Sequence, residues 1–100
     1  MSTNDGVLMS EEMIVTGEEA LKVADALTES SFRILQLISE ERLDVSTIAK
    51  RLNLSEAYIS EQIHRLEKLK LVKVSYEPGR RGIRKICELA VKKIVMVIKP

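Results

Sequence analysis

The side chains that most often carry out covalent or metal chemistry are scarce in this sequence. Among its 100 residues there is one histidine, His64, and one cysteine, Cys87. The two fall on different expected elements, so they form neither a nucleophile–base pair nor a ligand set for a metal ion. The four glycines are dispersed and do not form a phosphate-binding loop. The sequence therefore predicts no catalytic residue, no metal site and no cofactor, and we expect a protein that is not an enzyme.

The chemistry that the sequence does favour is electrostatic. Residues 1–29 hold seven acidic side chains against Lys22 alone, a net charge of −6, whereas residues 45–100 have a net charge of +8. Three arginines of the basic half, Arg80, Arg81 and Arg84, lie in one short segment. This asymmetry predicts an anionic partner for the C-terminal half. Nucleic acid, membrane headgroups and an acidic protein all satisfy the charge alone.

Hydrophobic spacing indicates the elements that must position these groups. A period of 3.6 residues predicts helices at 18–27, 31–39, 45–52 and 55–69. The period then changes to 2, which predicts a β-hairpin with strands at 71–76 and 83–89 around a tip at 78–82. A continuous β-branched run at 94–98 predicts a further strand, covered on both faces.

Single residues mark the ends of these helices. Thr16 and Glu19 have the spacing of a capping box for the first helix. Asp44 and Ser55 are expected to cap the third and fourth helices. Asn53 is expected to end the third helix in the left-handed conformation, which asparagine tolerates better than most residues.

Several other residues are assigned ordinary structural roles. Phe32 is expected on the buried face of the second helix, together with Leu35 and Ile38. Cys87 is expected to be a small core hydrophobe, and a single cysteine excludes an internal disulfide. His64 is expected to be a solvated side chain rather than a ligand or a switch.

The order of the elements predicts a winged helix-turn-helix, an α+β (mainly α) fold in which helices are followed by a β-hairpin wing and a C-terminal strand. The third and fourth helices must cross closely, and Ala49 is small enough for the crossing point. The polar face of the fourth helix is then free to enter a major groove. Arg80 and Arg81, at a glycine-flanked turn, can contact phosphates or a minor groove. We therefore expect double-stranded DNA as the partner, with the helix at 55–69 in the major groove and the wing at 77–85 on the backbone or in the minor groove.

The residues expected to contact DNA lie at the start of the third helix, on the outer face of the fourth helix and in the wing. They are Ser46, Thr47, Ser55, Glu56, Ala57, Tyr58, Ser60, Glu61, Gln62, Arg65, Gly79, Arg80, Arg81 and Arg84. Side chains that touch base edges set sequence preference, whereas those on phosphates set affinity. Changes at Tyr58 or Gln62 should therefore alter mainly the preferred sequence.

The motif DVSTIAKRLNLS at 44–55, continued by LEKLKLV at 66–72, resembles the ArsR-type regulators. The wing YEPGRRGIRK at 76–85 is similar to that of archaeal members of this family. The resemblance spans residues 18–90 and implies a homodimer bound to a palindromic operator. It does not imply metal sensing, because the Cys pairs and His–carboxylate clusters of the sensors are missing. The remaining alternative is a site between subunits built from His64 and carboxylates.

Three positions depart from the pattern of that family. It usually has histidine where this chain has Gln62, often a basic residue at Glu61, and glycine at Lys70. A carboxylate at position 61 repels phosphate unless it accepts a hydrogen bond from a cytosine amino group. These differences concern the target sequence rather than the fold.

The ends of the domain are expected to form a homodimer interface. The apolar faces of residues 13–27 and 94–98 are the candidates, within a single domain at 13–100 that follows a flexible tail at 1–12. An uncovered apolar strand promotes aggregation, so residues 94–98 should pair with residues 13–15 of the same or the partner chain. The sequence contains neither a membrane-spanning run nor a signal peptide, so we expect a cytoplasmic protein without a membrane partner. No small-molecule effector is evident.

Two other functions fit the same features. Winged helices also serve as subunits for protein–protein interaction, and Glu56 and Glu61 on the outer face of the fourth helix suit this role. A non-specific, chromatin-like protein that coats DNA is the second alternative. Titration against duplexes at several salt concentrations separates the three, because only a specific regulator retains a preference for one sequence.

Overall fold

The computed structural model describes residues 12–100. The flexible tail expected at 1–12 therefore lies outside the described residues, except for Glu12, which begins a strand. The helices are α2 (Gly17–Ala26), α3 (Glu29–Ile38), α4 (Val45–Leu52) and α5 (Glu56–Lys68). The strands are β1 (Glu12–Thr16), β2 (Leu43–Asp44), β3 (Val72–Gly79), β4 (Gly82–Leu89) and β5 (Lys93–Val97). This order confirms the predicted winged helix-turn-helix.

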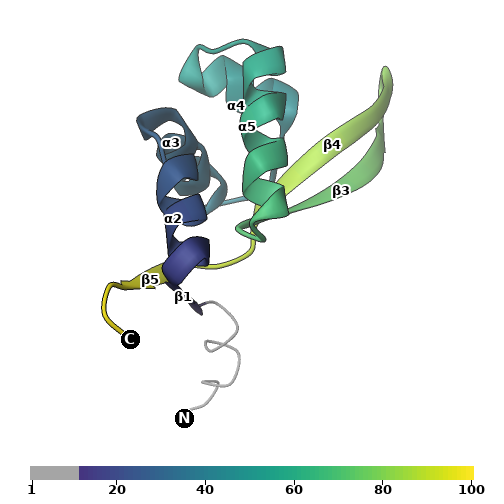
Figure 1. The fold of residues 1–100 in the computed structure, drawn as a ribbon. Helices are drawn as coiled ribbons and strands as arrows, with labels where there is room; N and C mark the ends of the chain where they lie inside the picture. The colour runs from purple at the N-terminus through teal and green to yellow at the C-terminus, as the bar shows by residue number, and fades with distance from the viewer. Residues whose placement is uncertain (1–11) are drawn as a thin grey trace.

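The helices form one cluster, from which the β3–β4 hairpin projects, and β1 and β5 lie side by side beneath α2 (Figure 1). Strands β2, β4 and β3 form an antiparallel sheet in that order. In the hairpin Val74 pairs with Cys87 and Gly79 pairs with Gly82, so the turn consists of two residues. The strand β2 was not among the predicted elements, because two residues are too few to show a hydrophobic period.

Strands β1 and β5 form a separate parallel pair, with Met13 opposite Ile94 and Val15 opposite Met96. The predicted pairing of the C-terminal run with residues 13–15 thus occurs within one chain. The prediction that this run is covered on both faces is wrong for the single chain. Neighbouring strand residues point to opposite faces. Within this run Met96 is 38% and Ile98 is 97% exposed, whereas Ile94 packs against the core cluster.

The core is aliphatic, as predicted, and is built mainly by α3, α4 and α5. Ile34, Ile48, Ile59 and Ile63 are fully buried within it. Cys87 of β4 is also fully buried, and this burial raises the pKa of its thiol to about 11. A buried thiol of this kind is chemically inert, which confirms that Cys87 serves as a small core hydrophobe.

The prediction that Phe32 is buried is wrong, because its side chain is 53% exposed. Helix α3 turns Ser31, Ile34 and Ile38 inward. With 3.6 residues per turn, Phe32 lies beside that row rather than in it. Ser31 occupies the buried position and donates a hydrogen bond of 2.6 Å to the carbonyl oxygen of Ala26, so its hydroxyl is satisfied in the interior.

Three of the predicted helix-end residues behave as expected. Asp44 Oδ1 accepts a hydrogen bond of 2.9 Å from the Thr47 amide at the start of α4. Ser55 Oγ accepts one of 3.1 Å from the Tyr58 amide at the start of α5. Asn53 ends α4 in the left-handed conformation, with φ of 58°. These residues fix the length and the ends of the two helices that matter for function.

The capping box expected at Thr16 and Glu19 is absent, because Thr16 makes no side-chain cap hydrogen bond. Thr16 is the last residue of β1, and Gly17, with φ of 56°, makes the bend from strand to helix. The capping box is instead on α3, between Thr28 and Ser31. It starts α3 earlier than the sequence predicted.

Lys70, which stands where the resembled family has glycine, adopts the left-handed conformation with φ of 65°. Its amide donates to the Glu67 carbonyl at 2.9 Å, and the Leu71 amide donates to the Leu66 carbonyl at 3.0 Å. These two bonds form a Schellman motif that ends α5 and leads the chain into β3. A side chain with a Cβ atom makes this conformation unfavourable by about 1–2 kcal/mol.

We expect Lys70→Gly to raise the free energy of unfolding by about 1 kcal/mol, because the relief of strain exceeds the extra freedom of glycine in the unfolded chain. Urea unfolding of the two proteins measures the difference. Lys68→Gly is the matched control, since Lys68 is an exposed lysine with a helical backbone, and it should lose stability. A less stable Lys70→Gly protein would contradict the role given to the left-handed turn.

Candidate nucleic-acid interface

Helices α4 and α5 form a helix-turn-helix. Ile48 and Ala49 of α4 belong to the same buried cluster as Ile59 and Ile63 of α5. Ala49 is 4% exposed, so a small residue does occupy this closely packed region. Leu54 in the connection is 38% exposed and does not belong to this cluster.

Helix α5 has one buried and one exposed face. The buried residues are Ile59, Gln62, Ile63 and Leu66. The exposed residues that recur every three or four positions on the opposite side are Ala57, Glu61, His64 and Lys68. This spacing places them in one row along the helix, which we call the outer row of α5.

The prediction that Gln62 lies on the exposed face is wrong, because Gln62 is only 6% exposed. Its position is three residues after Ile59 and four residues before Leu66, and helical geometry therefore places it in the buried row. Gln62 is thus part of the buried row of α5, and the hydrophobic spacing of the sequence already contained this signal.

His64 belongs to the outer row but was not among the predicted contact residues. It is exposed and lies three residues after Glu61 and seven after Ala57. This i, i+4, i+7 spacing is visible in the sequence. His64 and Lys68 are the two members of the outer row that were not among the predicted contact residues.

Arg65 is turned away from the outer row. Its Nη2 atom lies 3.3 Å from Asp25 Oδ2 of α2, and the side chain is 42% exposed. This ion pair joins α5 to the acidic N-terminal half of the chain. The sequence could not predict it, because forty residues separate the partners.

The other predicted residues of the two helices differ in accessibility. Glu56 and Ala57 are exposed, as is the capping residue Ser55, whereas Tyr58 and Ser60 are half-buried. Tyr58 also packs against the core cluster, so it has a structural role in addition to any contact with a ligand. At the start of α4, Ser46 and Thr47 are both half-buried.

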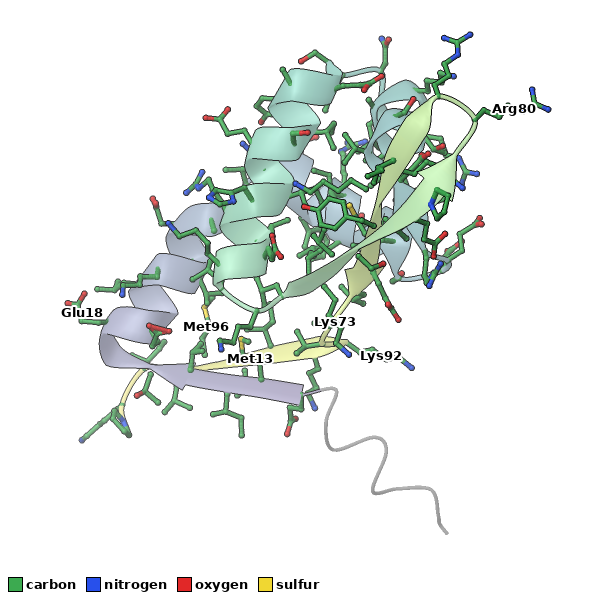
Figure 2. The ribbon with its side chains drawn as sticks, turned by 90° about the vertical axis from the view of Figure 1, so that its right-hand side faces the viewer. Met13, Glu18, Lys73, Arg80, Lys92 and Met96 are labelled. Carbon is green, nitrogen blue, oxygen red and sulfur yellow. The ribbon has the colours of Figure 1, made fainter. Side chains whose placement is uncertain are left out.

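The hairpin carries Arg80 and Arg81 at its turn, and both are exposed. Figure 2 shows Arg80 at the outer end of the hairpin, far from the β1–β5 pair that holds Met13 and Met96. Gly82, with φ of +116°, supplies the conformation that this turn requires. Gly79, which is half-buried, pairs with it across the turn.

Arg84 of β4 forms an ion pair with Asp44 of β2. Its Nε atom donates a hydrogen bond of 2.9 Å to Asp44 Oδ2, and the Asp44 side chain is 14% exposed. Hydrogen bonds from Thr47, opposed by partial burial and aided by the charge of Arg84, lower the pKa of Asp44 from 3.8 to about 2. The carboxylate therefore stays ionised and links the start of α4 to the hairpin.

We expect Asp44→Ala to lower the free energy of unfolding by about 1–2 kcal/mol at neutral pH, because it removes a helix cap and an ion pair. The pKa of Asp44 is lower in the folded than in the unfolded state, so the contribution of the carboxylate is complete above about pH 4 and is lost as the pH falls toward 2. Unfolding in urea over this range should show the difference between the two proteins shrinking as the pH falls. Asp25→Ala, which removes an 85% exposed partner of Arg65, should show little dependence; an equal loss at every pH for Asp44→Ala would contradict the assignment.

In residues 12–100, groups of three or more His, Cys, Asp or Glu side chains that could hold a metal ion are absent. Over the same residues, every helix is too short or too polar to cross a membrane.

The family model that matches the chain is that of the MarR family, over residues 27–79. Among solved structures, reduced HlyU from Vibrio cholerae has a TM-score of 0.63 at 21% identity, covering 74% of this chain and 75% of that one. A homodimeric winged helix-turn-helix DNA-binding domain from Mycobacterium bovis, described as a possible ArsR-family regulator, has a TM-score of 0.63 at 20% identity, covering 90% and 73%. The adhesin competence repressor of Streptococcus pyogenes has a TM-score of 0.57 at 31% identity, covering 69% of this chain and 52% of that one. No curated protein sequence matches the chain.

A helix-turn-helix followed by a basic hairpin defines the class of winged-helix DNA-binding regulators. Within this class, the chain belongs to the MarR family. Proteins of the MarR and ArsR type are transcription regulators rather than enzymes, which confirms the prediction that this protein is not an enzyme. The resemblance to ArsR-type proteins is confirmed at the level of the winged-helix regulators, since both types occur among the structural neighbours.

Proposed function

We propose that the protein is a sequence-specific regulator of transcription that binds double-stranded DNA as a homodimer. In this proposal α5 enters the major groove, and the hairpin at 77–85 lies on the backbone or in the minor groove. The observation that carries it is the combination of an exposed outer row on α5 with two exposed arginines, Arg80 and Arg81, at the turn of a projecting hairpin.

The outer row of α5 supports contact with base edges. Ala57 near the start of the helix is small and offers a methyl group, which suits the methyl group of thymine. Glu61 can accept a hydrogen bond from a cytosine amino group, and His64 can donate or accept one. These three side chains suit discrimination between bases better than attraction to phosphate, because they contribute no fixed positive charge.

The hairpin turn adds fixed positive charge to that of Lys68 at the end of the outer row. Within residues 12–100, neither Arg80 nor Arg81 has an ion-pair partner, so both guanidinium groups are free to bind phosphate. Neutralised phosphates release counterions, which gives affinity without sequence information. In this proposal the side chains of α5 determine the preferred DNA sequence, and the arginines of the hairpin provide most of the affinity.

Selection of duplexes from a random-sequence pool, followed by titration at several salt concentrations, tests the proposal. A sequence-specific regulator retains a preference for the selected duplex over a scrambled duplex of equal length and composition. A protein that coats DNA shows only a steep dependence on salt. A subunit for protein–protein interaction binds neither duplex, and this result would refute the proposal.

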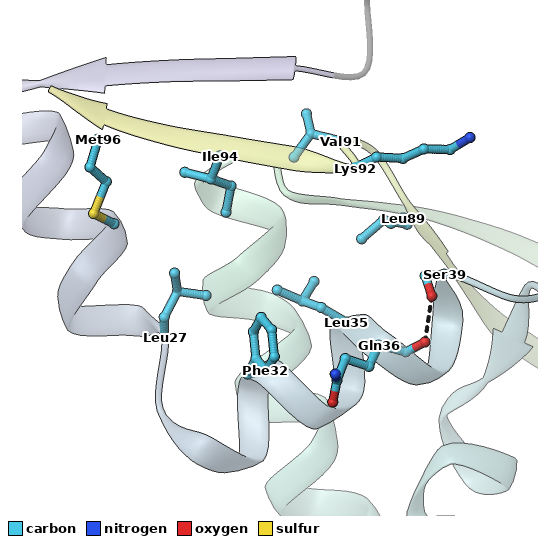
Figure 3. A pocket seen from close by; sticks show the side chains of 10 residues that line it. All are labelled: Leu27, Phe32, Leu35, Gln36, Ser39, Leu89, Val91, Lys92, Ile94 and Met96. Atoms are coloured by element: carbon cyan, nitrogen blue, oxygen red, sulfur yellow. Dashed lines mark hydrogen bonds between the residues drawn. The ribbon is translucent and has the colours of Figure 1, made fainter. Parts of the chain in front are cut away.

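An apolar surface at the other end of the molecule supports a homodimer. A groove of about 410 Å³ between α3 and β5 is lined mainly by apolar side chains, including Leu27, Phe32, Leu35, Ile94 and Met96 (Figure 3). Phe32 is 53% and Met96 is 38% exposed in the single chain. A second copy that covers these side chains would remove them from water, and a domain of the Mycobacterium bovis neighbour is homodimeric.

We expect Phe32→Glu to weaken the homodimer by about tenfold or more, because a charge would be buried at the interface. Sedimentation equilibrium measures the association constant. Ile83→Glu is the control, since Ile83 is 77% exposed but lies on the hairpin, away from the groove. A strictly monomeric wild-type protein would refute the homodimer and leave DNA recognition by the single chain to be tested separately.

A further inference from the structure

Two ion pairs join the outer half of the β3–β4 hairpin to the segment between α3 and α4. Arg84 of β4 donates from Nε to Asp44 Oδ2 at 2.9 Å, and Arg42 donates from Nη2 to Glu77 Oε2 of β3. We call Arg42, Asp44, Glu77 and Arg84 the wing-tether cluster. Each strand of the hairpin thus has one charged tether to the body of the protein.

The wing-tether cluster lies on one face of the sheet. Glu77 and Arg84 are directly opposite each other in the register of β3 and β4, and such partners point to the same face. Arg42 and Asp44 flank Leu43, whose side chain is buried, so the two charged side chains share the other side of this short segment. Because β4 lies between β2 and β3, Arg42 reaches across β4 to its partner.

Asp44 is a fixed anchor for this cluster. One carboxylate oxygen accepts the Thr47 amide that caps α4, and the other accepts Arg84 Nε, each at 2.9 Å. The carboxylate cannot turn away from Arg84 without uncapping α4. The direction of the hairpin is therefore coupled to α4, and through the shared core to α5.

Arg84 is poorly suited to contact DNA itself. Its charge is already paired with Asp44, whose side chain is 14% exposed, so Arg84 offers a phosphate less net positive charge than an unpaired arginine does. Arg80 and Arg81 at the turn have no such partner within the described chain. The turn lies three residues beyond Glu77, about 10 Å along an extended strand, so a hairpin that is no longer held by these ion pairs can carry the two arginines away from a phosphate.

We propose that the wing-tether cluster is a positioning device for the hairpin, and that Arg84 acts through Arg80 and Arg81 rather than by touching DNA. This inference rests on the proposed function. It assigns Arg42 and Glu77, which sequence analysis did not single out, to the same task as Arg84. It also replaces the predicted DNA contact at Arg84 with an indirect role.

A double-mutant cycle on the duplex selected from the random pool tests the indirect role. Arg84→Ala is made in the wild-type protein and in the variant Arg80→Ala/Arg81→Ala. We expect about a fivefold loss of affinity in the wild-type background and less than about a twofold further loss when the tip arginines are absent. An equal loss in both backgrounds, with the salt slope falling by about 1 for Arg84 alone, would show a direct phosphate contact and overturn the proposal.

Exchange of the second ion pair supplies a rescue test. Glu77→Arg places two like charges together and should weaken binding, although it adds a positive charge to the hairpin. Adding Arg42→Glu restores an ion pair with reversed polarity and should recover most of the affinity; failure to recover it would count against positioning. Arg33→Ala is the matched control, because it removes an arginine from an exposed ion pair with Glu29 on α3, and it should leave affinity unchanged.

A measurement without DNA separates failure of this inference from failure of the proposed function. Spin labels at Ala57→Cys on α5 and Arg81→Cys on the hairpin turn report the distance between the two elements. The native Cys87 is fully buried and does not compete for the label. Arg84→Ala should broaden the distance distribution, whereas an unchanged distribution overturns the positioning role whether or not the protein binds a duplex.

Discussion

Replacing both Arg80 and Arg81 by alanine should weaken binding to every duplex by roughly tenfold to a hundredfold, and it should lower the slope of log affinity against log salt by about 2. Both side chains are exposed at the turn of the hairpin, and neither is held by another part of the described chain. The loss should be nearly the same for the selected and the scrambled duplex, because phosphate contacts have no sequence information. Fluorescence anisotropy at a series of salt concentrations measures both quantities.

The control for this experiment removes two cations elsewhere. Lys22→Ala/Arg33→Ala changes the net charge of the protein by the same amount, from positions on α2 and α3 where both side chains are 62% exposed. It should leave affinity and slope within about twofold of the wild-type values. If the two double variants lost affinity equally, general charge rather than the hairpin would explain DNA binding.

Ile48→Ala should lower the free energy of unfolding by about 3–5 kcal/mol, because the deletion leaves a cavity in a fully buried part of the core. Ile48 lies on α4, which supports α5 in the helix-turn-helix. The free energy of unfolding of a domain of this size is about 5–15 kcal/mol, so the substitution should remove a large fraction of it. Urea unfolding followed by circular dichroism measures the loss.

Ile98→Ala is the matched control for the core substitution. It deletes the same atoms from a side chain that is 97% exposed, and it should change the stability by less than about 0.5 kcal/mol. Similar losses at the two positions would contradict the assignment of Ile48 to the centre of the core.

Local patterns predicted the helix-turn-helix closely. The expected helix at 45–52 agrees with α4 at both ends, because Asp44 and Asn53 act through hydrogen bonds and backbone conformation within a few residues. The hairpin was predicted for a similar reason, since alternation and paired glycines are local signals. By contrast, Phe32 and Gln62 were placed on the wrong faces. The helical position of Gln62, three residues after Ile59 and four before Leu66, indicates burial although glutamine is usually exposed. Phe32 lies three residues before the buried Leu35, so helical spacing alone did not show that it is exposed.

Contacts between distant segments were beyond the sequence analysis. Arg65 with Asp25, and Arg42 with Glu77, join residues that are far apart in the chain. No periodicity connects such partners, so a basic residue predicted to face DNA can instead be held by a carboxylate. The predicted interface therefore included Arg84, although its Nε atom donates a hydrogen bond to Asp44.

The parallel pairing of β1 with β5 has a consequence for the order in which the molecule assembles during synthesis. Glu12 pairs with Lys93, so β1 cannot form its strand pair until residue 93 has been synthesised. The segment from α3 to β4 has its own contacts between near neighbours and can collapse first as it leaves the ribosome, since short-range contacts form faster than long-range ones. On this argument the pairing of β1 with β5 forms after the contacts between α3 and β4, and in a nascent chain halted before residue 93 Met13 and Ile14 would have no strand partner from β5.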